Sequence, residues 1–178
     1  MGITALEFFI PDSCAIITAA MSIMKKYSIY APLIDSLKKA FGNSFKTVVL
    51  FGSKARKQAK EASDHDIFLI IKNLSSRPLE RQKQIRTAIL DIPLRVNTIA
   101  KTPEEFEKNL TPLILEICVD GICLYGEDYF EPYRKKALDA LKCSRLKRKR
   151  VGQEWYWHFD RIPEKEWELT WEGFRELP

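Results

Sequence analysis

The chain lacks the paired cysteines of a disulfide scaffold or a zinc site. Its four cysteines, Cys14, Cys118, Cys123 and Cys143, show no CxxC spacing and no flanking pair of histidines. No secretory signal precedes them, so a reduced, cytoplasmic compartment fits best. Because no second half of a zinc site accompanies Cys118 and Cys123, we expect both to be packing residues.

The chain also lacks a hydrophobic run long enough for a membrane span. The apolar segment Cys14–Met24 has eleven residues, whereas a spanning helix needs roughly 20. It follows Pro11 and Asp12 rather than a basic segment, which argues against a signal peptide. We interpret it as a buried or partner-facing helix in an N-terminal helical extension, residues 1–32. No membrane partner is expected.

Internal repeats and low-complexity segments are absent as well. Hydrophobic residues make up 46% of the chain and charged residues 30%, which excludes disordered, collagen-like and coiled-coil classes. A length of 178 residues allows one core of about 100–150 residues with an appendage. We therefore expect one soluble domain with extensions.

Charge is distributed unevenly. The net charge of +5 favours an anionic partner, but six of the positive charges fall within residues 142–150. All four tryptophans follow, in an acidic tail. We expect residues 142–178 to form a basic, aromatic appendage packed on the domain or on a second subunit. The basic run has three readings: a solvated helix end, a nucleic-acid contact, or the partner of the acidic tail.

The segment between these extensions alternates helical and strand patterns. Helical periodicity and breakers predict helices, and β-rich apolar runs predict strands. In chain order these are helix 33–41, strand 47–51, a short helix 53–58, strand 67–71, helix 78–90 and strand 94–100. Strand 67–71 is apolar without alternation, as expected for a central strand covered on both faces.

Two cap signals extend this order. Thr102 and Glu105 form a capping box around Pro103, and Thr111 with Pro112 repeats the cap-plus-proline device. A helix at 113–119, a short edge strand at 122–125 and a helix at 133–141 complete the domain. A strand is expected at 167–172, where apolar and polar residues alternate. Residues 33–141 thus predict an α/β (α+β) domain, a mixed β-sheet flanked by helices.

Residues suited to phosphate and metal chemistry lie at the ends of two predicted strands. At Gly52 and Ser53 a strand turns into a helix, whose N-terminus favours an anion that glycine lets approach closely. Asp64 and Asp66 stand at the mouth of the next strand, and i, i+2 spacing points both carboxylates to one face. Such a pair suits Mg²⁺ or Mn²⁺ shared with triphosphate oxygens. His65 points the other way.

This pattern resembles the signature of the minimal nucleotidyltransferases of the DNA polymerase β superfamily. The resemblance covers about residues 33–120 and rests on Gly-Ser, a ten-residue spacer and Asp-x-Asp entering an apolar strand. It implies that Gly52, Ser53, Lys54 and Arg56 bind nucleotide. It also implies that Asp64 and Asp66 are the catalytic and metal-binding acids.

Two positions depart from the family pattern. Lys57 stands where the family usually has glycine. The third carboxylate, counted back from the Thr102 helix start, falls on Asn97. Since Asn cannot accept a proton at neutral pH, loss of a general base there would cost about 10²–10⁴-fold in rate. Asp91 could substitute only from the far end of the strand, whereas Glu104 and Glu105 are expected to serve as cap residues.

Two functions follow from the resemblance. The first is Mg²⁺-dependent transfer of a nucleoside monophosphate from an NTP to an acceptor hydroxyl. The alternative is a catalytically degenerate module that binds nucleotide or a protein partner, such as a helical toxin or an acceptor-binding subunit. Oligomerisation is compatible with both. His65 and His158 are expected to be packing or surface residues.

Overall fold

A mixed sheet forms the centre of the molecule. The computed structural model describes residues 28–60, 62–152 and 154–177. Within them a four-stranded sheet has the order β3-β2-β1-β4. Its strands are β1 (Phe45–Phe51), β2 (His65–Ile71), β3 (Val96–Lys101) and β4 (Ile122–Tyr125). β1 pairs antiparallel with β2 and β4, whereas β2 and β3 run parallel and are connected through helix α4 (Pro78–Ala88).

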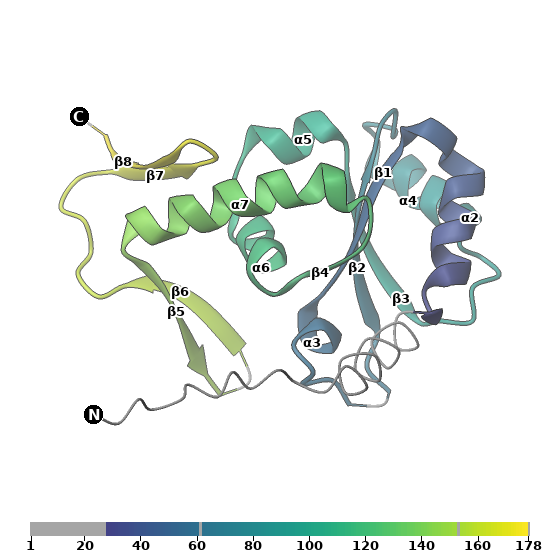
Figure 1. Cartoon of the computed structure of the whole chain (residues 1–178), viewed down its shortest axis with the longest axis horizontal. Coiled ribbons are helices and arrows are strands. Elements are labelled where there is room, and N and C mark those ends of the chain that lie inside the picture. Colours follow the sequence, from purple (N-terminus) through teal and green to yellow (C-terminus); the bar gives the residue numbers. More distant parts are fainter. Residues whose placement is uncertain (1–27, 61, 153, 178) are drawn as a thin grey trace, which may run out of the picture.

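Helices cover both faces of this sheet (Figure 1). α2 (Ala31–Phe41) and α4 pack on one face, and α5 (Pro103–Lys108), α6 (Pro112–Asp120) and α7 (Glu127–Ser144) pack on the other. Alternation along β2 divides its side chains between the two cores: Ile67 and Leu69 face α2 and α4, whereas Phe68 and Ile70 face α5 to α7. The central strand is therefore buried on both sides, as its apolar sequence predicts.

Short elements and caps complete the domain. η1 (Gly42–Ser44) follows α2, and α3 (Gly52–Ala55) follows β1. Thr102 and Glu105 form the predicted capping box, and the Thr111 hydroxyl accepts from the main-chain N–H of Ile114 at 3.3 Å. Glu105 also accepts from Arg81 at 2.7 Å. Both predicted helix starts are confirmed.

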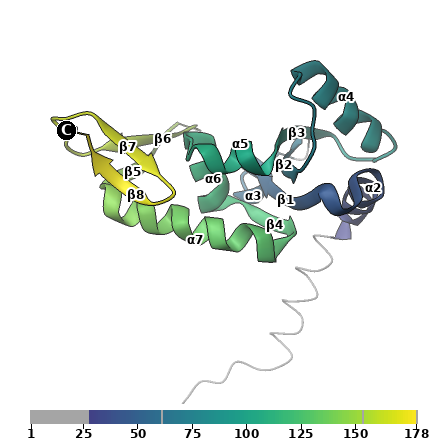
Figure 2. The ribbon, with the colours of Figure 1, turned by 90° about the horizontal axis from the view of Figure 1, so that it is seen from above.

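Two hairpins form the C-terminal part of the molecule and extend from one end of the domain (Figure 2). The first pairs β5 (Leu146–Val151) with β6 (Glu154–Phe159), and the second pairs β7 (Trp167–Thr170) with β8 (Gly173–Glu176). Trp171, between β7 and β8, is buried with its ring centroid 5.1 Å from that of Phe106 and 5.4 Å from that of Tyr133. The second hairpin is thereby anchored in the domain core.

The basic run differs most from its predicted structure. α7 extends to Ser144, and residues 146–151 form β5 rather than a solvated helix end. A strand made almost entirely of Lys and Arg carries no apolar alternation, so the pattern gave no strand signal. α7 also begins at Glu127, before the expected start at Tyr133, with Pro132 inside it.

The remaining expectations concern cysteines and membranes. Cys118 is buried and Cys123 half-buried, both as free thiols, and burial raises the pKa of Cys118 to about 12. Their packing role is confirmed. The segment Cys14–Met24 lies outside the described residues. In the described part of the chain, every helix is too short or too polar to cross a membrane.

Candidate active site

The turn after β1 brings Gly52 against Asp66. Register explains the contact, because Phe51 at the end of β1 pairs with Asp66 near the start of β2. Gly52 has φ +70°, and a Cβ built on it would lie 2.2 Å from Asp66 Oδ2. A side chain at position 52 would therefore collide with the carboxylate and strain the backbone. Glycine is required for the strand to turn this close to the acid.

α3 starts at this turn and supplies the anion-binding geometry. The first N–H groups of a helix have no acceptor within the helix, and here they belong to Gly52, Ser53 and Lys54. Each of these residues is half-buried. Burial lowers the pKa of His65, and the positive charge of Lys54 lowers it further, which places that cation near the start of β2. The turn thus combines the first main-chain N–H groups of a helix with a nearby positive charge.

Asp64 lies just before β2 and is more exposed than Asp66. Its Oδ1 is 3.0 Å from an Nη of Arg95, and the two side chains are 49% and 75% exposed. The prediction that Asp64 and Asp66 face one side rests on strand alternation, but β2 begins at His65, and Asp64 borders a surface hollow with Leu94 and Arg95. His65 Nδ1 lies 2.8 Å from the Tyr30 hydroxyl on the α2 side of the sheet.

Asn97 lies beside Asp66 on the neighbouring parallel strand. The two residues are register partners, and Asn97 Nδ2 donates to Asp66 Oδ1 at 3.3 Å. The position expected for a third acid therefore holds an amide that orients Asp66. Asp91 instead lines a surface hollow with Lys39 and Lys83, between α2 and α4. That places Asp91 away from Asp66.

Arg56 turns towards α6. Its Nη1 lies 3.5 Å from Asp120 Oδ2 and 3.8 Å from Glu116 Oε2. Arg148 of β5 reaches the same two oxygens, at 2.6 Å from Asp120 Oδ2 and in contact with Glu116 Oε2. Burial raises the pKa of Glu116, and the charge of Arg148 limits that rise. We call Arg56, Glu116, Asp120 and Arg148 the ion cluster.

Sequence reasoning missed the ion cluster. Its members come from three elements, and Arg148 follows Asp120 by 28 positions in the sequence. One local signal existed: Glu116 and Asp120 are spaced i, i+4 on a predicted helix that is otherwise apolar. The remaining part of the basic run is more ordinary, since Lys147 pairs with Asp160 on the surface. Lys147 therefore fits the third interpretation of the basic run, in which the run pairs with the acidic tail.

The residues at the sheet edge fit a hard divalent cation. Asp64 and Asp66 offer carboxylate oxygens, and Mg²⁺ is typically held by one or two carboxylates together with substrate phosphates. Among the described residues, no group of three His, Cys, Asp or Glu side chains is placed to hold a metal by itself. Two carboxylates would fill only part of the coordination shell of Mg²⁺, and phosphate oxygens of a substrate would fill the rest.

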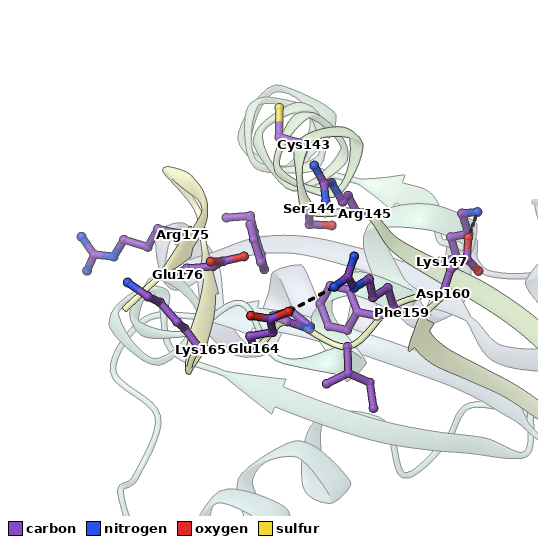
Figure 3. A pocket seen from close by; sticks show the side chains of 14 residues that line it. Cys143, Ser144, Arg145, Lys147, Phe159, Asp160, Glu164, Lys165, Arg175 and Glu176 are labelled. Carbon is purple, nitrogen blue, oxygen red and sulfur yellow. Dashed lines mark hydrogen bonds and ion pairs between the residues drawn. The ribbon is translucent and has the colours of Figure 1, made fainter. Parts of the chain in front are cut away.

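A separate cavity of about 850 Å³ lies in the C-terminal part. It opens between the end of α7 and the two hairpins, with Phe159 and Phe174 in its lining (Figure 3). Its charged side chains are largely paired with one another or with neighbours, as in Lys147 with Asp160 and Arg161 with Glu164. None of the predicted site residues lines it.

The first strand of the mixed sheet turns at a glycine into a short helix, and an acid of the second strand lies beside that turn. This combination is typical of a nucleotidyltransferase-type α/β domain. The family model described as "Polymerase beta, Nucleotidyltransferase" matches residues 33–130. The chain therefore belongs to the polymerase β nucleotidyltransferase family. The predicted family and fold are confirmed.

Three proteins with a printed name or a solved structure are similar to this chain. A Methanocaldococcus jannaschii protein named "Putative protein adenylyltransferase MJ1305" is 30% identical over 136 residues, 73% of this chain and 91% of that protein. A solved toxin-antitoxin with AMP-PNP is 17% identical with a TM-score of 0.48, covering 62% of this chain and 85% of that one. A chain in the solved complex of tri-AMPylated Shewanella oneidensis HEPN toxin with MNT antitoxin is 14% identical, with a TM-score of 0.44. The match covers 64% of this chain and 84% of that one.

Proposed function

We propose that the chain transfers AMP from ATP to a hydroxyl group of a protein acceptor. The observation that carries the proposal is the contact between Asp66 and the Gly52 turn, which sets an acid against the N-terminus of α3. The choice of AMP and of a protein acceptor comes from the 30% identical relative, whose name gives protein adenylyl transfer. The acceptor would be a separate protein or an acceptor-binding subunit.

The binding roles follow from position. The main-chain N–H groups of the α3 turn and the Ser53 hydroxyl would hold the β- and γ-phosphates. Lys54 and Arg56 would offset the triphosphate charge. Asp64 and Asp66 would hold Mg²⁺. When bound, Mg²⁺ would neutralise phosphate charge and polarise the phosphoryl oxygens.

In the reaction, the acceptor oxygen forms a bond to the α-phosphorus while the bond between that phosphorus and the bridging oxygen breaks. Pyrophosphate leaves with the bonding electrons. The hydroxyl proton must go to a base, and Asn97 cannot take it at neutral pH. The proton would therefore pass to Asp64, Asp66 or water, and Asn97 would contribute by orienting Asp66 through its 3.3 Å hydrogen bond.

That same hydrogen bond supports a second candidate function. An amide at the third-acid position leaves nucleotide binding intact while removing a general base, which typically contributes about 10²–10⁴-fold. The chain would then be a nucleotide-dependent binding subunit with slow or no turnover.

Labelled nucleotides separate the two candidates. The full chain is incubated with each α-labelled NTP, with Mg²⁺ or Mn²⁺ and with candidate protein acceptors. The proposal expects label from ATP on an acceptor, lost in Asp64→Ala/Asp66→Ala and kept in the surface control Asp139→Asn. Metal-dependent ATP binding without transfer would support the binding subunit. If the chain shows no ATP binding and no transfer, both candidate functions are overturned.

A further inference from the structure

The ion cluster joins the candidate nucleotide site to the C-terminal hairpin. Arg56 comes from the end of α3, Glu116 and Asp120 come from α6, and Arg148 comes from β5. Figure 1 shows α6 between α3 and the β5–β6 hairpin. The four side chains are 12–22% exposed, so their charges interact with less solvent screening than surface pairs.

Both arginines contact the same two carboxylate oxygens, but Arg148 lies closer to them than Arg56 does. Arg148 is 2.6 Å from Asp120 Oδ2, a full charge-assisted hydrogen bond. Arg56 is 3.5 Å from that atom and 3.8 Å from Glu116 Oε2, at or beyond the limit of a hydrogen bond. Glu116 and Asp120 are therefore satisfied mainly by Arg148, and Arg56 is held only loosely.

The hairpin fixes Arg148 for this role. The Arg148 guanidinium carbon lies 4.3 Å from the ring centroid of Trp155 and 5.8 Å from that of Trp157. Stacking on two indoles restricts the side chain and aims it at α6. Two indoles of the hairpin thus lie against the Arg148 guanidinium.

We propose that Arg148 is a positioning residue that neutralises Glu116 and Asp120, so that Arg56 keeps its charge available for the triphosphate. Without Arg148, two acids would face one arginine, and Arg56 would close onto both. The arginine at the end of α3 would then be withdrawn from the nucleotide. Because this role presupposes the proposed ATP site, its test begins with the affinity of the unaltered chain for ATP.

The experiment measures binding of Mg²⁺ and an ATP analogue with an uncleavable α,β bridge, by calorimetry. Arg148→Met is expected to weaken binding about tenfold, the value of a charge-assisted contact. Arg148→Lys should recover most of that loss. The matched control Arg161→Met removes an equal charge from an exposed pair with Glu164 and should bind as the unaltered chain does.

Two further variants separate this role from a merely structural one. Neutralising the acids in Arg148→Met/Glu116→Gln/Asp120→Asn should restore affinity to within about threefold, because Arg56 is again free; simple loss of hairpin packing would not be restored. In Arg56→Met, adding Arg148→Met should weaken binding no further. Thermal unfolding of each variant checks that it is folded at the temperature of the measurement.

The outcomes are distinct. If the unaltered chain binds the analogue but Arg148→Met binds equally well, or the triple variant stays weak, the role of Arg148 is wrong and the proposed function stands. If the unaltered chain does not bind the analogue with Mg²⁺, the proposed function fails and this role with it.

Discussion

Two pairs of neighbouring acids occupy different environments in this protein. Asp64 and Asp66 lie two residues apart at the edge of the sheet, where one exposed arginine and one amide contact them. Glu116 and Asp120 lie four residues apart on α6, where two arginines share their oxygens. The second pair is thus shared by two mostly buried arginines, whereas the first pair has an exposed arginine, an amide and the nearby Lys54 around it.

The difference shows that carboxylate spacing alone does not identify a metal site. What separates the pairs is how positive charge reaches them: the C-terminal hairpin brings the mostly buried Arg148 to α6, whereas the exposed Arg95 contacts Asp64 and Lys54 lies near the start of β2. A pair neutralised by the protein's own arginines has little charge left for a cation, whereas we propose that the pair beside the Gly52 turn takes a metal together with its substrate.

The largest expected effect is on the sheet-edge pair. Asp66→Asn removes the charge and leaves the shape, so it should lower kcat/KM for nucleotidyl transfer by about 10²–10³-fold, the cost of losing one preorganised electrostatic group. Asp120→Asn should lower it much less, since that residue would act only through Arg56. Rates of labelled-AMP transfer measure both. Equal losses would remove the distinction between the pairs.

Adding an acid to the sheet edge sharpens the comparison. Asn97→Asp would restore a proton acceptor beside Asp66 and should raise the transfer rate by about 10²-fold, the lower end of general-base catalysis. Single-turnover kinetics with saturating Mg²⁺ and ATP would detect the gain. A rate unchanged or reduced in a folded variant would show that proton removal does not limit the proposed transfer.

Matched arginine substitutions test stability. Arg148→Met leaves two half-buried acids with one distant partner and should lower the free energy of unfolding by about 2 kcal/mol. Arg95→Met breaks an exposed pair and should lower it by less than about 1 kcal/mol. Urea denaturation followed by tryptophan fluorescence compares them, and the account fails here if Arg95→Met proves the more damaging change.

The smallest effect concerns pH. Burial raises the pKa of Glu116 in the folded chain, so the folded state binds its proton more tightly than the unfolded state does. The stability contributed by Glu116 is then fully present below its unfolded pKa and is lost as the pH rises through the folded value. The free energy of unfolding of Glu116→Gln, compared with that of the unaltered chain, should therefore increase as the pH is raised from about 4 to about 7. A difference that is constant with pH would show that Glu116 has an ordinary pKa.

Much of the domain could be predicted because its signals are local. The apolar run Ile67–Ile71 predicts a strand buried on both faces, and the spacing of Thr102 and Glu105 predicts a helix start; both are present. Counting back from Thr102 to Asn97 also gives the residue that stands beside Asp66. Register in a regular sheet transmits such counting over many residues.

The rest could not be predicted because it depends on distant partners. β5 has apolar residues only at its two ends, and its inward-facing Arg148 is explained by its contacts with Trp155 and α6. The contact of the Arg56 side chain with α6 depends on the same neighbours, so no pattern near residue 56 could predict it. The closeness of Asp66 to Gly52 follows from the pairing of β1 with β2, which no local pattern reveals.

The proposed nucleotide site can be examined in a crystal structure with Mg²⁺ and an uncleavable ATP analogue. We expect the triphosphate to lie against the main-chain N–H groups that begin α3, with the cation between its oxygens and those of Asp64 and Asp66. A nucleotide bound in the cavity beside Phe159, or a cation held without Asp66, would contradict it.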